Sequence, residues 1–259
     1  MKYINFCSGS KGNCTYIESQ EAKLIIDCGS TKRYLSQSLH NYNIQLDSVD
    51  ALLITHDHGD HIAQLRLFDS IKTCISPVDL NRDTFNPMPY QSFMIKDIEV
   101  TALVLSHDSG LTYGYVLNSD GVKLVYITDT GYLKDNNLDY IRDADIYIIE
   151  SNHNVDKLMQ STRPHMTKMR ILSDTGHLSN EDSAKIIKQV IGPNTKEIVL
   201  AHLSEEANSE SLALKAFAKV IDTKEVHIHC AKQKIETLGG FLYEEYTNET
   251  LNIHLAHLK

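Results

Sequence analysis

The sequence predicts an α+β protein built as a four-layered αββα sandwich, in which two β-sheets pack face to face and helices cover both outer faces. Two observations predict this fold class. Segments with strand character followed by helical segments occur twice, in two similar-sized halves of the chain. No linker rich in Pro, Gly or Ser separates the halves. Because sheets bury their apolar faces against another layer, we expect one domain over residues 1–259.

The first half is expected to be rich in strands because β-branched and aromatic residues alternate there with polar ones. The expected strands cover residues 2–6, 14–18, 22–27, 50–55, 72–76, 97–106, 113–119 and 122–128. Ser119, Asp120 and Gly121 are typical of a hairpin turn between the last two strands. Helices are expected at 31–42 and at about 61–69. Residues 77–89 hold three of the five prolines and are expected to form one long loop.

Helices and strands alternate in the second half. A short helix is expected at 135–142 and a strand at 145–150. A Ser-Asn-Glu-Asp sequence, typical of a helix N-terminus, begins a helix at about 179–191. The remaining expected elements are a strand at 196–200, a helix at 209–220, a strand at 225–229 and a last strand near 241–246.

Composition excludes several classes of protein. Hydrophobic residues make up 42% and charged residues 23% of the chain, as in ordinary globular proteins. No apolar stretch approaches the ~20 residues that cross a bilayer, and the N-terminus lacks the apolar core of a secretory signal. The five cysteines have no CxxC spacing and are expected to be reduced thiols. We therefore expect a cytoplasmic protein without a membrane partner.

The charge balance restricts how the protein could meet nucleic acid. The net charge of −9 argues against a large surface that wraps DNA, because proteins that coat nucleic acid are usually basic. It does not exclude a nuclease, since bound divalent cations would offset negative charge locally. The chain also contains 13 histidines, and histidine is the commonest metal ligand.

The strongest motif is THDHGDH at residues 55–61, which contains the pattern HxHxDH. A chain of this composition would contain that pattern by chance with odds of about 0.002. His56 and His58 lie two apart in an extended segment that leaves a strand, so both imidazoles point the same way. Asp60 and His61 follow where the chain turns into a helix and are directed at an adjacent point. This spacing predicts ligands for two neighbouring metal ions.

Two such ions need about four ligands each, so further ligands must come from elsewhere in the chain. Three candidates directly follow apolar strands, at the strand ends where loops gather above a sheet. They are His107, Asp129 and His202. The alternative is that each histidine only ends its strand by hydrogen bonding to a carbonyl group. That alternative is weaker for the candidates taken jointly than for any one of them.

The set formed by Asp27, the HxHxDH motif, His107, Asp129 and His202 resembles the five motifs of the metallo-β-lactamase superfamily, in the same order. The resemblance implies an αββα fold with a centre of two divalent metal ions. It assigns His56, His58 and His107 to one ion, Asp60, His61 and His202 to the other, and Asp129 to both. It also implies that Asp27 orients the histidine loop. Zn²⁺ suits the imidazoles and Mn²⁺ suits the added carboxylates, so the sequence leaves both metals open.

The sequence differs in two ways from other members of the superfamily, and each difference argues against one of their activities. True β-lactamases carry a cysteine where this chain has Asp129, so hydrolysis of antibiotics is not expected. Only 72 residues, 130–201, separate Asp129 from His202, which leaves no room for the long insertion of the β-CASP nucleases.

The sequence more closely resembles the YycJ/WalJ-like branch of this superfamily. The matching words are CSGSKGNC (7–14), LIIDCG (24–29), LLITHDHGDHI (52–62), LSHDSGLTYGY (105–115), YITDTGY (126–132), IIESNHN (148–154), GHLSN (176–180) and LAHLSEEAN (200–208). That branch is associated with nuclease activity, including exonuclease action on DNA, as is its relative RNase Z.

His177 resembles the histidine that faces the substrate phosphate in RNase Z-like and PhnP-like phosphodiesterases, and Glu150 resembles the carboxylate that orients it. The resemblance implies a proton shuttle in which Glu150 positions His177, which protonates the leaving oxygen or binds the phosphate. The alternative is that GHLSN only begins a helix with Ser179 as its N-cap, and the two roles are compatible. His153 and Asn152 match the word IIESNHN without an assigned role.

Other motifs are less specific. The glycine-rich loop Ser8–Asn13 either contacts a phosphate or braces the metal-binding loop. Arg163, Lys168 and Arg170 form either a basic rim for a polyanion or a solvated face. Four further histidines are expected to pack or to lie on the surface rather than to bind metal. They are His227, His229, His254 and His257.

Together these inferences predict a dinuclear-metal-dependent phosphodiester hydrolase, a nuclease of DNA exonuclease type, with Asp60, His177 and Glu150 in the catalytic machinery. A metal-bridging hydroxide held by Asp60 and Asp129 would attack phosphorus. The alternatives are a small-molecule phosphodiesterase, an ester, thioester or lactone hydrolase of the same fold, or a binding module without catalysis. The expected partner is nucleic acid or another phosphodiester. No segment specifies an interface, so homo-oligomer formation stays open.

Overall fold

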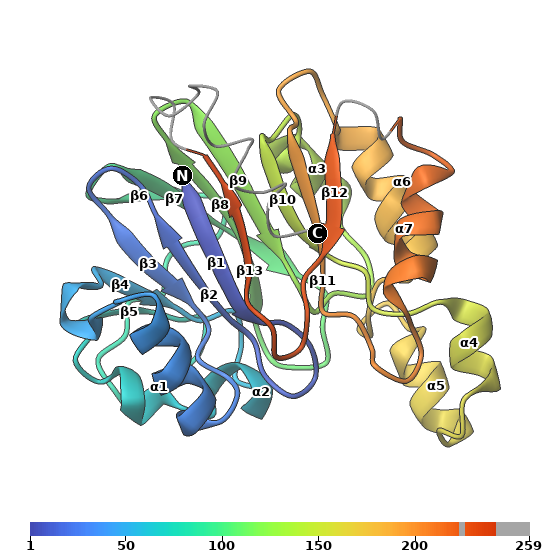
Figure 1. Cartoon of the computed structure of the whole chain (residues 1–259), viewed down its shortest axis with the longest axis horizontal. Coiled ribbons are helices and arrows are strands. Elements are labelled where there is room, and N and C mark those ends of the chain that lie inside the picture. The colour runs from blue at the N-terminus through green and yellow to red at the C-terminus, as the bar shows by residue number, and fades with distance from the viewer. Residues whose placement is uncertain (223–225, 242–259) are drawn as a thin grey trace.

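The computed structural model describes residues 1–222 and 226–241. These residues form two β-sheets that lie face to face, with helices outside each sheet (Figure 1). The expected four-layered αββα sandwich is therefore confirmed. Within the two described ranges, no helix is long and apolar enough to span a membrane.

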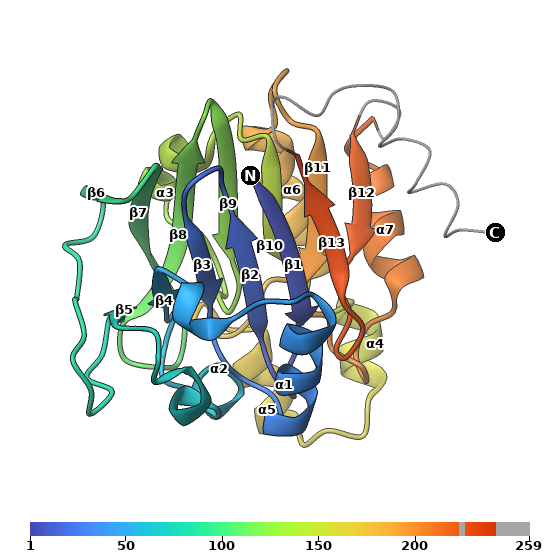
Figure 2. The same ribbon diagram turned by 60° about the vertical axis from the view of Figure 1, so that its left-hand side comes forward.

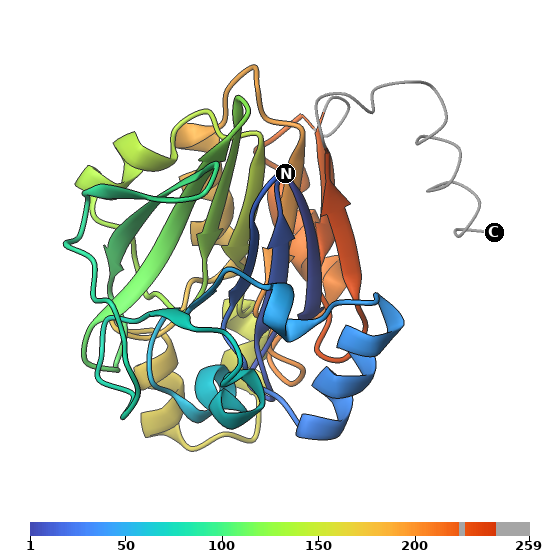
Figure 3. The ribbon, with the colours of Figure 1, turned by 90° about the vertical axis from the view of Figure 1, so that its left-hand side faces the viewer.

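The first sheet combines strands from both ends of the described chain. Its strands are β1 (Lys2–Cys7), β2 (Cys14–Glu18), β3 (Lys23–Ile26), β4 (Ala51–Leu53), β5 (Thr73–Ile75) and β13 (Thr237–Gly240). They lie in the order β13-β1-β2-β3-β4-β5, and Figure 2 shows β1 between β13 and β2. Strands β3, β4 and β5 run parallel, whereas the other pairs are antiparallel. Helix α1 (Lys32–Asn41) lies outside this sheet (Figure 3). Its Leu35 and Leu39 are buried in the apolar cluster on the outer face of the sheet.

The second sheet follows the chain without interruption. Its strands are β6 (Ser92–Ile95), β7 (Ile98–Leu105), β8 (Thr112–Ser119), β9 (Val122–Ile127), β10 (Ile146–Glu150), β11 (Glu197–Ala201) and β12 (His227–Cys230). Their order is β12-β11-β10-β9-β8-β7-β6, and β9 to β12 run parallel. Helices α3 (Asp135–Ile141), α6 (Asn180–Val190) and α7 (Glu210–Ala218) cover the outer face. Ser179 is the N-cap of α6, as the sequence predicts.

The core between the sheets follows from the alternation of side chains along the strands. In β9, Leu124 and Tyr126 belong to the cluster shared with the first sheet, whereas Val125 and Ile127 belong to the cluster beneath the outer helices. Burial on both faces is typical of strands in the parallel part of a sheet. The carboxyl ends of β9, β10 and β11 are thereby fixed, and these ends carry the candidate site.

The prediction of one continuous helix at about 61–69 is wrong. The chain instead forms the four-residue helix α2 (Gly59–Ile62) and a short 3₁₀ helix (Leu65–Phe68). The cause is a competing set of backbone hydrogen bonds: Cys28 N donates to His61 O (2.7 Å), and Gln64 N donates to Cys28 O (3.0 Å). Because His61 O and Gln64 N are bonded outside the helix, a continuous helical ladder cannot form through them.

Four elements were not expected from the sequence. Strand β6, helices α4 (Val155–Gln160) and α5 (His165–Ile171), and strand β13 are each only four to seven residues long. Such short segments contain too few residues to show a hydrophobic period. The strand expected near 241–246 lies outside the described residues apart from residue 241, as do His254 and His257.

Glu197 joins the two sheets at the start of β11. Its Oε1 accepts a hydrogen bond from the Tyr3 hydroxyl (2.9 Å) and lies 2.8 Å from His229 Nε2, while its Oε2 accepts from Gly240 N (2.9 Å). Tyr3 and Gly240 belong to the first sheet, and His229 to the second. His227 stacks on His229, and ligand atoms of both lie within 4.8 Å of a Glu197 oxygen. The hydrogen bonds of Glu197 account for this cluster without a metal ion.

We expect Glu197→Ala to lower the free energy of unfolding by about 2–3 kcal/mol, because the buried Tyr3 and the partly buried His229 and Gly240 lose their acceptor. Burial alone would raise the pKa of Glu197, but His229 holds it below the ordinary value of 4.5. The stabilisation is therefore complete above about pH 4.5 and is lost as the pH falls through the lower pKa of the folded protein. Urea unfolding at pH 7 and pH 4 measures both effects. The control is Glu99→Ala, an exposed carboxylate in β7; an equal loss in both variants would contradict the prediction.

Candidate metal centre

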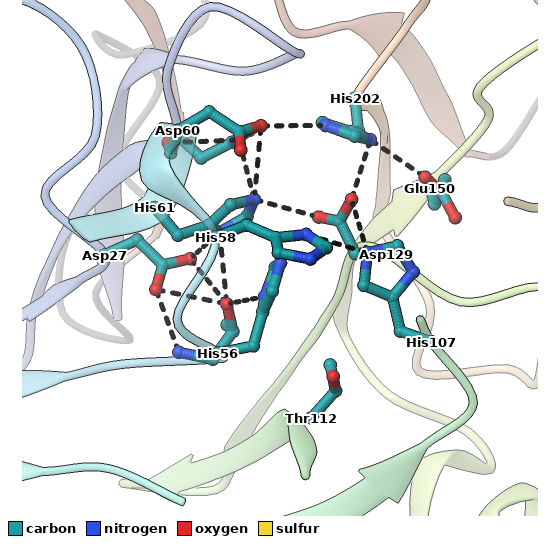
Figure 4. A network of polar contacts seen from close by, with 12 residues as sticks. Asp27, His56, His58, Asp60, His61, His107, Thr112, Asp129, Glu150 and His202 are labelled. Carbon is teal, nitrogen blue, oxygen red and sulfur yellow. Dashed lines mark hydrogen bonds and ion pairs between the residues drawn. The ribbon is translucent and has the colours of Figure 1, made fainter. Parts of the chain in front are cut away.

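The predicted ligands meet at one edge of the two sheets. His56 and His58 follow β4, and Asp60 and His61 lie on α2. The other three follow the ends of separate strands of the second sheet. They are His107 after β7, Asp129 after β9 and His202 after β11. Figure 4 shows these side chains directed toward one another.

The ligand atoms form overlapping groups. One group contains His56, His58 and His107, and another contains Asp60, His61 and His202. Within each group the ligand atoms lie within 4.8 Å of one another. These groups contain the residues that the resemblance assigns to each of the two ions.

Asp129 lies between the two groups. Its Oδ2 is 3.1 Å from His61 Nε2, and its Oδ1 is 3.8 Å from His107 Nε2 and 3.3 Å from His202 Nδ1. His61 and His202 belong to one group and His107 to the other. One carboxylate therefore reaches both groups, which is the geometry that a bridging ligand requires.

Buried atoms without partners show that the centre fits metal ions. His56 Nε2 and His202 Nε2 are buried and make no hydrogen bond within the part of the chain that the structure describes, and buried Asp129 Oδ2 has only the 3.1 Å contact with His61 Nε2. Leaving such atoms unsatisfied costs free energy, so each one needs an explanation. A divalent cation coordinated by imidazole and carboxylate groups would satisfy all three.

The electrostatics of the centre also favour cations. Burial alone would lower the pKa of His61, but the carboxylates of Asp27 and Asp129 raise it to about 10. In contrast, burial and the neighbouring His61 lower the pKa of His56. Carboxylates and imidazoles thus surround the same small volume, where positive charge is stabilised and neutral imidazoles with open lone pairs remain available.

Three residues of the centre have left-handed backbones. Asp27 and His202 directly follow strands β3 and β11, Asp129 lies two residues after the end of β9, and their φ values are 60°, 55° and 58°. This region is uncommon for residues other than glycine, although Asp and His adopt it more readily than most. The conformation turns each side chain away from the direction of its strand and toward the centre. Strain of this kind is typical of functional sites.

Asp27 holds the histidine loop in place. Its Oδ2 is 2.7 Å from His61 Nδ1, and its Oδ1 accepts a hydrogen bond from Thr55 N (2.9 Å). The Thr55 hydroxyl lies 3.0 Å from His56 Nδ1 and 3.1 Å from His61 Nδ1. These contacts orient the opposite ring nitrogens of both histidines toward the centre. Sequence reasoning missed Thr55, although it directly precedes the HxHxDH motif.

The glycine-rich loop at residues 8–13 braces the ligands. The Ser8 hydroxyl accepts a hydrogen bond from His202 N (2.7 Å), and Asn13 N donates to Asp60 O (2.8 Å). The Asn13 side chain also lies 2.9 Å from His61 Nε2. Gly12 has a φ of 147°, and a Cβ there would come within 2.5 Å of Ser30 Cα. Of the two roles considered from the sequence, these contacts support bracing.

Glu150 positions two histidines at once. Its Oε1 lies 2.8 Å from His177 Nδ1 and 2.9 Å from His202 Nδ1, and its Oε2 accepts hydrogen bonds from Thr130 N and Leu178 N. Burial alone would raise the pKa of Glu150, but His177 and His202 lower it, so the carboxylate stays ionised. The pairing with His177 was expected from the sequence, whereas the contact with His202 was not.

His177 lies beside the two groups of ligands. Its ring centroid is 5.2 Å from that of His107 and 5.3 Å from that of His202. Because Nδ1 faces Glu150, Nε2 is the ring nitrogen available to a substrate. The His177 side chain is 15% exposed, whereas that of Glu150 is fully buried. Only His177 of this pair can therefore touch a substrate.

Asn152 and His153, which the sequence left without an assigned role, differ in their contacts. Asn152 Nδ2 donates to His202 O (2.9 Å) and so supports the left-handed backbone there. His153 is buried, and burial lowers its pKa to about 4. Neither of its ring nitrogens makes a hydrogen bond to the described residues, and its ligand atoms belong to none of the groups around the centre.

Comparison with known proteins gives the family. A family model described as a beta-lactamase superfamily domain matches residues 23–203. The chain is 35% identical over 233 residues to exodeoxyribonuclease YycJ of Bacillus anthracis, which covers 84% of this chain and 88% of the relative. It is 34% identical over 230 residues to exodeoxyribonuclease WalJ of Streptococcus pneumoniae serotype 2, with 82% and 85% covered.

A solved structure agrees with this relationship at the level of the fold. The crystal structure of the metallo-beta-lactamase fold protein YhfI from Bacillus subtilis matches with a TM-score of 0.71 at 18% identity. The match covers 92% of this chain and 99% of that chain. The family model, the two relatives and the fold agree, and the chain belongs to the metallo-β-lactamase superfamily and, within it, to the YycJ/WalJ-like branch.

Proposed function

We propose that this protein is a nuclease that uses two divalent metal ions to hydrolyse phosphodiester bonds in DNA, starting from an end. The observation that carries the proposal is the position of Asp129 between two complete groups of ligand atoms, with His177 held beside them by Glu150. The names of the relatives YycJ and WalJ, both exodeoxyribonucleases, support DNA as the substrate.

We assign the proposed ligands to the two ions according to the groups that their ligand atoms form. His56, His58 and His107 would hold one ion, Asp60, His61 and His202 the other, and Asp129 both. When bound, the two ions supply Lewis-acid polarisation of the phosphodiester and make water more acidic. The imidazole majority suits Zn²⁺ and the two carboxylates suit Mn²⁺, so we propose one of these two metals.

The side chains of Glu150 and His177 prepare the departure of the leaving oxygen. Glu150 fixes the His177 ring through Nδ1, which leaves Nε2 free of that contact. A proton on Nε2 would be delivered to the departing oxygen when the P–O bond breaks, and a phosphate oxygen would be bound by the same N–H before that step. The buried Glu150 acts only through this ring and through His202, so its role is positioning.

Other parts of the sequence-based prediction remain part of this proposal. We propose one domain over residues 1–259, and the apolar core that both sheets share supports this for the residues that the structure describes. We also propose a cytoplasmic location. Self-association is to be measured by light scattering of the purified protein.

Metal removal tests the proposed function. Protein stripped with a chelator is expected to lose activity on end-labelled single- and double-stranded DNA, and to regain it with Mn²⁺ or Zn²⁺. Products that shorten from one end would establish an exonuclease and its polarity. Bis(p-nitrophenyl) phosphate is the small-substrate control. Cleavage of this compound alone would replace the proposal with a small-molecule phosphodiesterase, and cleavage of neither substrate would direct the test to thioesters and lactones.

A further inference from the structure

The segment that contains α4 and α5 differs in charge from the rest of the protein. Residues 155–171 contain four basic side chains and one acidic side chain, Asp156, which gives a net charge of +3. The whole chain carries −9, so the remainder carries −12. The basic residues are Lys157, Arg163, Lys168 and Arg170. A basic segment in an acidic protein is a candidate contact for a polyanion.

This segment lies beside the metal centre. It is inserted between Glu150 at the end of β10 and His177, which Glu150 holds. Figure 1 shows α4 and α5 at the same end of the sheets as α2, which carries Asp60 and His61. Gly176 O, just after α5, lies 3.2 Å from His107 Nδ1. The chain thus passes directly from the basic segment into the candidate site.

Arg170 reaches the group formed by His56, His58 and His107. It pairs with Asp108 Oδ2. The other oxygen of Asp108 lies 3.4 Å from His107 Nε2 and 3.7 Å from His58 Nε2. A single carboxylate therefore separates the exposed guanidinium of Arg170 from two candidate metal ligands.

Arg163 approaches the centre from the side of His202. Its Nε lies 2.8 Å from Glu206 Oε2, and its Nη2 lies 3.4 Å from the Ser204 hydroxyl. Ser204 is two residues after His202 and donates its backbone N–H to Asn152 O (2.8 Å). Arg170 thus pairs with the residue that follows His107, and Arg163 contacts a residue two positions after His202.

The two arginines contact different segments of the chain. Arg163 lies two residues before α5 and pairs with Glu206, whereas Arg170 lies near the end of α5 and pairs with Asp108. A small diester has only one phosphate, so it cannot give a separate phosphate to each guanidinium group. A polynucleotide carries a phosphate at every residue and can do so.

The present partners of the arginines are replaceable. Arg170 and Glu206 are exposed, and exposed ion pairs contribute little to stability. Phosphate accepts two parallel hydrogen bonds from a guanidinium group, as a carboxylate does. Asp108 and Glu206 therefore hold the guanidinium groups in place until a phosphate takes over, which reduces the entropy lost on binding. Lys168 donates to Met159 O and Ser161 O (both 2.7 Å), neutral acceptors that fix the α4–α5 turn.

We propose that Arg163 and Arg170 bind backbone phosphates of a single polynucleotide strand on the two sides of the bond that is cut. This inference rests on the proposed function and assigns to α5 the recognition of the polymer. It explains how a protein with a net charge of −9 engages a long polyanion: two guanidinium groups act locally, beside an acidic centre whose charge the divalent cations offset.

The test measures salt dependence of binding, which does not require turnover. Metal-loaded full-length protein is titrated against a fluorescein-labelled single-stranded oligodeoxynucleotide with phosphorothioate linkages, which resist cleavage, and anisotropy is recorded at several KCl concentrations. Each of Arg163→Ala and Arg170→Ala is expected to weaken binding about tenfold and to reduce the slope of log K against log [salt] by about 0.7. The double variant should lose about twice that slope.

Matched variants separate this role from a structural one. Arg142→Ala removes an exposed arginine that pairs with Asp139 far from α5, before the start of β10, and is expected to bind like the wild type. Arg170→Lys keeps the charge and is expected to retain the slope while losing part of the affinity. Wild-type slopes in both alanine variants, or an equal loss in Arg142→Ala, would overturn the proposal.

A kinetic comparison distinguishes failure of this inference from failure of the proposed function. On an oligonucleotide with ordinary linkages, the double variant is expected to lose at least tenfold more kcat/KM than on bis(p-nitrophenyl) phosphate, mainly through KM. Equal losses on both substrates would overturn the arginine assignment while leaving a nuclease in place. If the wild type cleaves no DNA, the proposed function fails, and the anisotropy slopes still decide whether α5 binds a polynucleotide.

Discussion

Asp60→Ala is expected to leave one bound metal ion per chain instead of two and to reduce turnover about 10³-fold or more. Asp60 Oδ2 lies 3.7 Å from His61 Nε2 and 3.9 Å from His202 Nε2, so it belongs to only one of the two groups. The other group keeps all of its imidazoles. Loss of one ion removes several kcal/mol of charge stabilisation in the transition state, and each ~1.4 kcal/mol corresponds to tenfold in rate.

Metal content by plasma mass spectrometry and DNA cleavage under saturating metal check this prediction together. The matched control is Asp57→Ala, which removes an exposed carboxylate from the same motif and is expected to keep both ions and full activity. Two ions and wild-type turnover in Asp60→Ala would refute the two-metal assignment. Loss of both ions would show instead that the two groups assemble as one unit.

His177→Ala is expected to keep both metal ions and to lose about 10²–10⁴-fold in turnover on DNA, the range typical of general acid catalysis. The ring is absent from the two groups assigned to the ions; it belongs to a further group with Asp129, Glu150 and His202, in which its Nδ1 faces Glu150. Its loss therefore removes a proton donor to the leaving oxygen while the donor set around Asp129 remains.

Substrates with different leaving groups distinguish a role of His177 in proton donation from a role in phosphate binding. p-Nitrophenolate departs without a proton, so a general acid matters much less for bis(p-nitrophenyl) phosphate than for DNA, whereas a phosphate-binding role would affect both substrates equally. His40→Ala, an exposed histidine on α1, serves as control. A drop in metal content in His177→Ala would mean that this ring is a ligand, and unchanged DNA cleavage would remove it from the mechanism.

Much of the site could be predicted from the sequence because its ligands have short-range signatures. The HxHxDH motif places four donors within six residues, and His107, Asp129 and His202 each directly follow an apolar strand. Strand ends in a layered fold meet at a common edge, so these positions indicated a shared centre before any contact was visible. The layers were predictable for the same reason, since a nearly continuous apolar run, as in β9, indicates a strand that is buried on both faces.

Contacts between distant segments, in contrast, left no local signature. The Ser8 hydroxyl meets His202 N across 194 residues, and Glu150 meets His202 across 52. The expected helix at 61–69 failed because Cys28, far away in sequence, takes backbone partners from it.

The sequence by itself determined which atoms can bind metal and which faces of the strands are buried, since both depend on residue type and spacing along a few turns or strands. Only the tertiary structure decided that Asp129 lies between two groups, that Glu150 serves two histidines, and that Arg163 and Arg170 pair with Glu206 and Asp108. The physical reason is that hydrogen bonds and ion pairs between side chains act over about 3–4 Å in space, whatever the separation along the chain.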